Sequence, residues 1–335
     1  MHRPIEEANV WRASDLGGQA SWTHALTPAM VGEIDGAMRA ALAAGTPPWR
    51  MTEADFPLPR TAPLLAALYR DLEDGRGFAV LTGWPVDDYA YEQNVAAFCG
   101  LSAHLGRIKV QNYEGDRIVD VRDEGVDYSH RSRGYRSNKR LPFHTDGADS
   151  VGLLCLGEAA QGGLSLLASA TEVFNVVLAE RPDLIPLLER GFHHHRRRQH
   201  PEGENPVSAH RIPVFSFNRG LLHCCYNRNP IDWVEREGMT LAPEEVEALD
   251  YFDSVLARPE LHAELAMRKG DMQFVNNFVI LHSRTSYEDG PDRRRHLVRL
   301  WLENPEGRRM AEGLLDLYVP GSSRYQASAS RNPGR

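Results

Sequence analysis

The chain has 335 residues, of which 42% are hydrophobic and 25% charged, and its formal net charge is −8. This composition is typical of a soluble globular protein, and the acidic balance argues against nucleic acid as a partner, because phosphate contacts dominate such binding. No apolar run approaches the roughly 18 residues that a membrane span requires, and residues 1–7 lack the apolar core of a signal peptide. We therefore expect a cytoplasmic protein that acts on a small molecule, with no nucleic acid and no membrane partner. Assembly into a homo-oligomer stays open.

The first part of the chain is expected to be mostly helical. Thr27 and Pro28 suit the N-cap and first turn of a helix, and apolar residues follow them at helical spacing. Further helices are expected over residues 61–72 and 89–105. Between them, residues 77–83 form a short apolar run bounded by glycines, which predicts a buried strand.

The character of the sequence changes after Gly106, where short apolar runs bounded by turn residues follow one another. These runs cover residues 118–121, 151–156, 165–168, 214–217, 221–226, 272–275, 278–282 and 296–302. Such a cadence is typical of a β-sandwich or barrel. Two helical segments, which start at Thr171 and near Pro243, interrupt it. The pattern predicts an α+β fold with a jelly-roll core and with flanking and inserted helices.

No internal repeat and no low-complexity linker divides the chain. We expect a single domain over residues 1–320, in which a helical part, 1–106, packs on a β core, 107–304. Residues 321–335 are rich in Ser, Gly, Asn and Arg and are expected to form a flexible tail.

His144 and Asp146 form the only His-x-Asp motif in a chain with 14 histidines. In an extended segment, residues i and i+2 point to the same face, so both side chains can reach one ion. Two imidazoles and one carboxylate are the ligand set of non-haem Fe(II) oxygenases. His282 ends an apolar run and is the candidate for the third ligand. Taken alone, these residues would be explained better by a surface His-x-Asp and an unrelated histidine.

Arg295 and Arg299 follow His282 and suggest an anion site. A guanidinium matches a carboxylate with two parallel hydrogen bonds, which suits a dicarboxylate cosubstrate. The two arginines share one face if residues 296–302 form a strand. A structural ion pair is the alternative for Arg299. Arg293 and Arg294 fall in the preceding turn and are expected to be solvated.

Four ordered blocks resemble those of the taurine dioxygenase-like family of Fe(II)/2-oxoglutarate-dependent oxygenases. The blocks are residues 76–83, the His144 motif with the glycine pair before Ser165, residues 270–277 leading into His282, and residues 295–301. The similarity runs from about Gly77 to about Asn304. It implies a double-stranded β-helix, a variant of the jelly roll.

By position, the resemblance implies that His144, Asp146 and His282 bind Fe(II). Arg295 and Ser165 would then bind 2-oxoglutarate, and O2 would be the second cosubstrate. Arg299 matches an arginine that lies near the substrate or the cosubstrate.

The substrate is expected to be a small polar molecule that carries a carboxylate, such as an amino acid derivative. Gln111 and Asn112 lie where the resembling family lines its substrate pocket, and Asn277 and Arg299 are further candidate contacts. Turn chemistry explains the asparagines equally well. An intact Asp146 favours hydroxylation over halogenation, but desaturation and ring formation stay open.

Two other function classes remain as alternatives. One is a catalytically inactive jelly-roll binding protein, and the other is a zinc-dependent hydrolase that uses the same triad and does not need Arg295. The run from His193 to Arg198 is expected to be a solvated edge or loop rim, because a strand would split its histidines between two faces. A basic rim for an anionic substrate is the alternative for this run.

Overall fold

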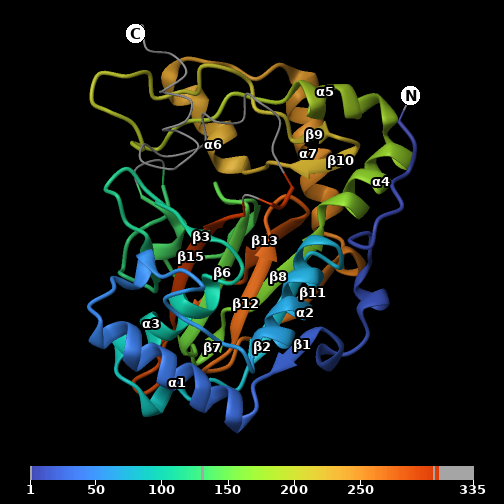
Figure 1. Cartoon of the computed structure of the whole chain (residues 1–335). Coiled ribbons are helices and arrows are strands. Elements are labelled where there is room, and N and C mark those ends of the chain that lie inside the picture. Colours follow the sequence, from blue (N-terminus) through green and yellow to red (C-terminus); the bar gives the residue numbers. More distant parts are fainter. Residues whose placement is uncertain (1, 130–131, 305, 309–335) are drawn as a thin grey trace, which may run out of the picture.

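The computed structural model describes residues 2–129, 132–304 and 306–308 (Figure 1). The α-helices are α1 (Pro28–Ala43), α2 (Ala62–Glu73), α3 (Tyr91–Ser102), α4 (Ala170–Glu180), α5 (Ile185–Arg190), α6 (Arg228–Asp232) and α7 (Pro243–Leu256). Short 3-10 helices cover Ala13–Leu16, Gln19–Trp22, Pro48–Arg50, Val86–Asp88, Gly134–Arg136, Pro182–Leu184, Trp233–Glu237 and Pro259–Leu261.

The strands form one large sheet, one smaller sheet and two separate pairs. The large sheet contains β1 (Thr23–Ala25), β2 (Phe78–Thr82), β12 (Met272–Asn276), β6 (Ser150–Gly157), β15 (His296–Glu303) and β3 (Arg107–Ile108) in that order, and β4 (Ile118–Val121) also pairs with β15. The smaller sheet has the order β11 (His262–Leu265), β8 (Ser165–Ser169), β13 (Ile280–Arg284) and β5 (Leu141–His144). The separate pairs are β9 (Phe215–Asn218) with β10 (Leu221–Cys224), and β7 (Gln161–Gly162) with β14 (Tyr287–Glu288). Residues 1–106 therefore supply two strands of the large sheet as well as helices.

The two larger sheets pack face to face. Phe78 and Val80 of β2 lie in one buried cluster with Leu167 of β8 and Ile280 of β13. Successive side chains of a strand point to opposite faces, so the residues between these positions face outward. Both faces of the central strands are buried, which is why their sequences are nearly continuous apolar runs.

Helices cover the outer faces of both sheets (Figure 1). On the large sheet, outward residues of β2, β6, β12 and β15 join α1, α2 and α3 in one hydrophobic cluster. On the smaller sheet, outward residues of β8 and β13 join α4, α5 and α7. The order of layers is thus helices, large sheet, smaller sheet and helices, and the space between the sheets is where functional side chains can project.

The structure confirms most of the predicted elements. Thr27 caps α1 by accepting a hydrogen bond from the backbone N–H of Met30 at 3.3 Å. The strand predicted over 278–282 begins two residues later, since β13 covers Ile280–Arg284. The Asn276 side chain accepts a hydrogen bond from the backbone N–H of Phe278 and holds a turn before the strand. His282 consequently lies in the middle of a strand. Strands β1, β3, β7, β11 and β14 were not predicted, and β5 was considered only as an extended segment that would let His144 and Asp146 reach one ion.

The predicted tail, 321–335, lies outside the described residues. Within the described part of the chain, no helix combines the length and the apolar character needed to cross a membrane.

The contact between α3 and Phe56 gives a test of the packing. A Cβ added at Gly100 would lie 2.3 Å from Cδ2 of the fully buried Phe56 ring. We expect Gly100→Ala to lower the free energy of unfolding by about 1–3 kcal/mol through overpacking, as measured by denaturant titration. Gly36→Ala in α1 is the matched control: nothing lies within 4 Å of its added Cβ, so this variant should gain about 0.5–1 kcal/mol. Equal effects of the two substitutions would contradict the packing described.

Candidate active site

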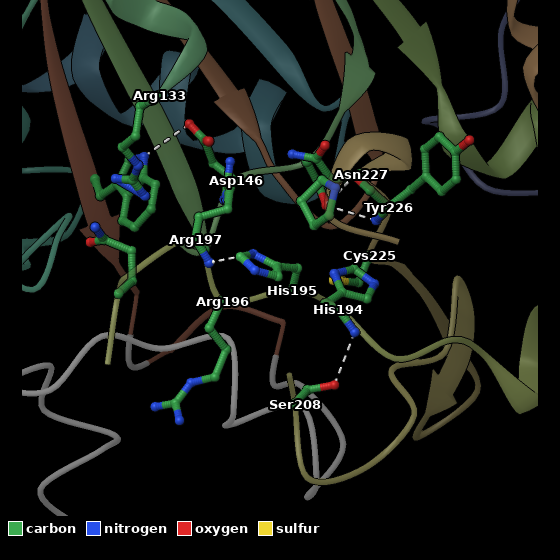
Figure 2. Close-up of a pocket in the computed structure, with 15 residues that line it drawn as sticks. Arg133, Asp146, His194, His195, Arg196, Arg197, Ser208, Cys225, Tyr226 and Asn227 are labelled. Atoms are coloured by element: carbon green, nitrogen blue, oxygen red, sulfur yellow. Dashed lines mark hydrogen bonds between the residues drawn. The ribbon is translucent and has the colours of Figure 1, made fainter. Parts of the chain in front are cut away.

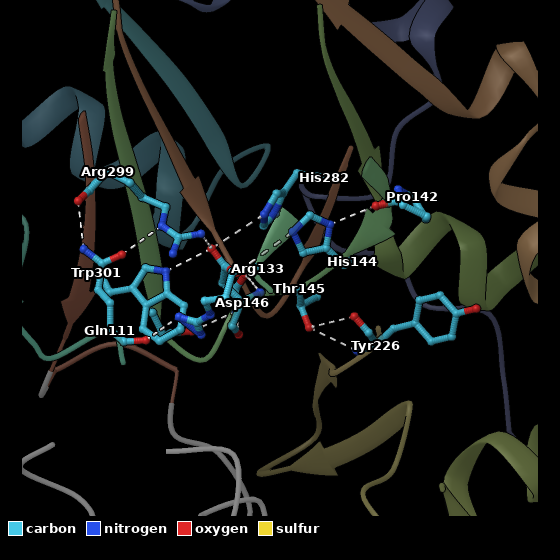
Figure 3. A network of polar contacts seen from close by, with 12 residues as sticks. Gln111, Arg133, Pro142, His144, Thr145, Asp146, Tyr226, His282, Arg299 and Trp301 are labelled. Carbon is cyan, nitrogen blue, oxygen red and sulfur yellow. Dashed lines mark hydrogen bonds and ion pairs between the residues drawn. The ribbon is translucent and has the colours of Figure 1, made fainter. Parts of the chain in front are cut away.

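The pairing of two strands places His144 beside His282 (Figure 3). β5 and β13 are antiparallel, and the two histidines are direct partners in the register. Their ring centroids are 4.4 Å apart. Nδ1 of His144 lies 2.8 Å from the carbonyl oxygen of Pro142, so Nδ1 carries the proton and Nε2 keeps its lone pair. The strand register therefore supplies two imidazoles at one point between the sheets.

Asp146 follows β5 in a loop that is held from two sides. Asn277 accepts from the backbone N–H of Asp146 at 2.7 Å, and its amide donates to the carbonyl oxygens of Asp146 at 2.6 Å and Ala148 at 2.9 Å. On the other side, the backbone N–H of Thr145 donates to the Tyr226 carbonyl at 2.8 Å, and the Thr145 hydroxyl accepts from the Tyr226 N–H at 3.0 Å. These bonds present the Asp146 carboxylate to the two histidines.

The charge of Asp146 is stabilised from β15. Its Oδ2 accepts from Nη1 of Arg299 at 3.1 Å and from the indole N–H of Trp301 at 2.9 Å (Figure 3). Burial raises the pKa of Asp146, but the charge of Arg299 and the hydrogen bond from Trp301 act against it and hold that pKa well below its usual range. Burial also lowers the pKa of His144 and brings that of His282 to about 3. At neutral pH the site therefore consists of one carboxylate and two neutral imidazoles.

These three side chains meet the requirements of a metal centre. Each offers one ligand atom, and the three atoms all lie within 4.8 Å of one another. The Asp146 oxygens lie 4.0 Å from Nε2 of His144 and 3.9 Å from Nε2 of His282. Two neutral imidazoles and one carboxylate suit Fe(II) and leave three coordination positions for other ligands.

Two buried arginines lie beside this centre without an acidic partner. Arg295 directly precedes β15, and Arg284 lies two residues after His282 on the same face of β13. Their guanidinium carbons are 5.2 Å and 4.8 Å from the centre of the Tyr287 ring. No carboxylate of the described residues forms an ion pair with either one, and Nη1 of both has no hydrogen-bond partner. Buried cations without a counter-charge are costly, and this pair could hold an anion.

Ser165 and the glycines before it belong to the same region. Ser165 is the direct partner of Arg284 in the pairing of β8 with β13. Gly163 has a φ of +73°, and a Cβ there would lie 3.0 Å from Cδ and Nε of Arg295. Gly163 thus makes room for the Arg295 side chain. Of the predicted cosubstrate residues, Arg295 and Ser165 lie in this region, whereas Arg299 lies against Asp146.

The predicted substrate contacts have internal partners. Gln111 accepts from Nε of Arg299 at 2.8 Å and donates to the Arg299 carbonyl at 2.8 Å. The Asn112 amide bonds Asp116 within its own turn. None of the side chains of Gln111, Asn112 and Asn277 lines the cavity beside the metal centre. Gln111 and Asn277 hold Arg299 and the Asp146 loop, and Asn112 holds a turn.

A basic cavity adjoins Asp146 (Figure 2). It encloses about 750 Å³ including its open mouth, and Arg133, His194 and Arg197 line it. The expectation of a solvated run at 193–198 is wrong for His194 and His195, which are buried, whereas His193 is partly exposed. The reason is tertiary: the backbone N–H of His195 donates to the Pro230 carbonyl at 2.8 Å, which draws the run against α6.

Sequence reasoning missed three residues of this region, Arg133, Arg284 and Trp301, whereas Arg197 belongs to the run for which a basic rim was the alternative. The i+2 relation to His282 was a signal for Arg284, and the i+2 relation to Arg299 was a signal for Trp301. Arg133 and Arg197 lie in loops, for which no periodic pattern exists.

The Asn277 clamp gives a test of metal binding. Asn277→Ala removes three hydrogen bonds to the Asp146 loop, so we expect divalent-metal affinity to fall about 10- to 100-fold, as measured with Co(II) by its visible spectrum. Asn112→Ala is the matched control, because it removes a buried amide that bonds only its own turn. Equal Co(II) affinities for the two variants would show that the clamp does not position Asp146.

Known proteins resemble the chain over most of its length. The sequence profile of the Taurine catabolism dioxygenase TauD, TfdA family matches residues 42–301. FR-33289 synthase from Streptomyces rubellomurinus (strain ATCC 31215) is 34% identical over 322 residues, which cover 94% of each protein. A uridine-5'-phosphate dioxygenase from a Streptomyces species is 26% identical over 182 residues, which cover 49% of this chain and 62% of that protein.

Solved structures share the fold at low sequence identity. Asparagine oxygenase in complex with Fe(II), 2S,3S-3-hydroxyasparagine and succinate has a TM-score of 0.64 at 18% identity, covering 84% of this chain and 93% of that one. The non-haem iron oxygenase OrfP in complex with Fe and alpha-ketoglutaric acid has a TM-score of 0.60 at 15% identity, covering 84% and 94%. The profile match and the identity to FR-33289 synthase show that the chain belongs to the Taurine catabolism dioxygenase TauD, TfdA family and is a 2-oxoglutarate-dependent non-haem iron oxygenase.

Proposed function

We propose that the protein hydroxylates a small anionic molecule, with His144, Asp146 and His282 as the ligands of Fe(II). The observation that carries this proposal is the meeting of three ligand atoms within 4.8 Å beside a basic cavity. We also propose that the two facing sheets form a double-stranded β-helix core. Fe(II) with 2-oxoglutarate and O2 supplies the oxidant that replaces C–H by C–OH, while 2-oxoglutarate becomes succinate and CO2.

Arg295, Arg284 and Ser165 are proposed to hold the distal carboxylate of 2-oxoglutarate. Both arginines are buried and have no carboxylate partner among the described residues, and both keep unpaired N–H groups. Burial lowers the pKa of Arg284 to about 10, so its guanidinium is still charged at neutral pH. Arg284 also braces the loop before β5, because its Nη2 donates to the carbonyls of Ser137 and Lys139. The remaining donors are free for the cosubstrate.

The chain's own side chains set the protonation and position of the ligands. Arg299 and Trp301 keep Asp146 ionised and bind one of its oxygens, and burial keeps the histidines neutral. An intact carboxylate at Asp146 occupies the position that a halide would need, which favours hydroxylation. Desaturation and ring closure would use the same ligands and depend on how the substrate lies.

The charge of the cavity supports an anionic substrate. Arg133 and Arg197 line it, and Asp146 is the carboxylate among its lining residues. Arg299, the arginine first considered for the substrate, is already engaged by Asp146 and Gln111. The similar proteins favour two kinds of anionic group: the asparagine oxygenase complex contains an amino acid product, which carries a carboxylate, and the uridine-5'-phosphate dioxygenase is named for a phosphate ester.

A zinc-dependent hydrolase with the same triad is the alternative, but it gives Arg295 no role and leaves Arg284 only that of bracing its loop. An anionic cosubstrate bound between the sheets would explain why both cations are buried without a carboxylate partner. The family to which the chain belongs also favours the oxygenase.

The cosubstrate assignment is tested by anaerobic titration of the Fe(II) protein with 2-oxoglutarate, followed by the visible charge-transfer band of the chelate. We expect Arg284→Gln and Arg295→Gln each to raise the Kd of 2-oxoglutarate about 10- to 100-fold, since hydrogen bonds between charged groups contribute about 1.5–3 kcal/mol. Arg293→Gln is the matched control, because Arg293 is exposed and pairs with Glu158. A well-folded wild-type protein without this band would overturn the oxygenase assignment, and an unchanged Kd for Arg284→Gln would limit Arg284 to bracing its loop.

A further inference from the structure

Two guanidinium groups in the basic cavity have no acidic partner. Arg133 and Arg197 line both the large cavity and the smaller one that meets it at Asp146. Arg133 donates to the Gln111 carbonyl at 2.7 Å and lies over the Trp301 ring at 5.6 Å. Within the residues that the structure describes, the Arg197 side chain forms no ion pair and no hydrogen bond; its backbone N–H donates to the His195 ring at 3.0 Å. Both cations are therefore available to a ligand.

The electrostatic surroundings show that these charges repel one another. Burial and then Arg197 and Arg299 lower the pKa of Arg133 to about 10. The nearest carboxylate, Asp146, is already engaged by Arg299 at 3.1 Å, so it does not fully offset the charges of Arg133 and Arg197. The charges of Arg133 and Arg197 are then left for the substrate to balance. A doubly charged group balances both, whereas a carboxylate or a sulfonate balances one.

A neutral imidazole, that of His194, lines the same cavity as Arg133 and Arg197. The His194 side chain is 3% exposed and lines the cavity, and its Nε2 has no hydrogen-bond partner (Figure 2). The backbone of His194 is fixed by a hydrogen bond, in which its N–H donates to the Ser208 hydroxyl at 3.0 Å. A buried polar atom without a partner is unusual in a native protein and indicates a missing ligand or water. His194 therefore adds a third polar group to Arg133 and Arg197 in the lining of this cavity.

We propose that this space binds a phosphoryl group of the substrate, R–PO3 with two negative charges, through Arg133 and Arg197, with His194 as the third contact. The inference rests on the proposed function and names the substrate class of that site. A tetrahedral group presents three oxygens, which match three contacts, whereas a planar carboxylate presents two. Bidentate guanidinium contacts favour such oxyanions. Because Asp146 lines the same cavity, the oxidised carbon lies only a few bonds from the phosphorus.

Both phosphonates and phosphate monoesters present this group, and small probes distinguish them. The protein loaded with Fe(II) and 2-oxoglutarate is titrated without O2 with ethylphosphonate, ethyl phosphate, propionate and ethanesulfonate, and the shift of the charge-transfer band is followed. We expect the two phosphorus compounds to bind at least 10-fold more tightly than the two monoanions. The ratio of the two phosphorus affinities then separates a phosphonate site from a phosphate ester site. Propionate or ethanesulfonate binding equally well would overturn the inference.

Single substitutions assign the contacts. Arg197→Gln and Arg133→Gln should each raise the Kd of the better phosphorus probe at least 10-fold. Arg198→Gln is the matched control: its backbone has the same left-handed conformation, with φ of +61° against +52° for Arg197, but its side chain is exposed. The Kd of 2-oxoglutarate, measured in the same samples, should stay unchanged and shows that each variant is folded.

The outcomes separate this inference from the function on which it rests. A band that forms with 2-oxoglutarate but does not respond to phosphorus probes overturns the phosphoryl site and leaves the oxygenase standing. Equal behaviour of Arg197→Gln and Arg198→Gln also overturns it. If no band forms at all, the proposed function and the inference both fail.

Discussion

Asp146 keeps a negative charge at a position that is almost closed to water, because the side chains around it stabilise the ionised carboxylate. Its side chain is 11% exposed, and burial alone would favour the protonated form. Arg299 and Trp301 bind one oxygen from β15, and Asn277 holds the backbone of the same residue. The site therefore depends on one carboxylate. The loop between β5 and β6 carries it, the large sheet supplies its hydrogen-bond donors, and the smaller sheet supplies the two histidines beside it.

Two cationic regions lie near this carboxylate. Arg284 and Arg295 lie between the sheets, and Arg133 and Arg197 lie in the cavity beneath the loops. Each pair is left without an acidic partner among the described residues, although an ion pair would relieve the cost of burial. Such an arrangement reduces stability in the free protein and favours binding of anions. Under the proposed function, separate pairs would let a dicarboxylate cosubstrate and an anionic substrate bind at the same time.

The layered fold explains how the ligands stay in place. Helices α1 to α3 cover one sheet and α4, α5 and α7 cover the other, so the strands that carry His282, Arg299 and Trp301 are buried on both faces. A one-residue slip of β13 would turn His282 away from His144 and expose its apolar neighbours to the metal site. The hydrophobic clusters thus fix the register, and the register fixes the distance between the two imidazoles.

The sequence by itself determined most of the elements and the three candidate metal ligands. Apolar periodicity is a local property, so it located α1, β2, β12 and β15, and the His-x-Asp spacing identified His144 and Asp146 because a two-residue period places both on one face. The shift of β13 was not predictable, since the Asn276 turn that starts it later depends on a side-chain hydrogen bond. Only the tertiary structure decided that Gln111 and Asn277 serve as positioning groups and that Arg133 and Arg197 meet at the cavity. These residues lie in loops or at strand ends, where long-range contacts and not local periodicity determine which side chains come together.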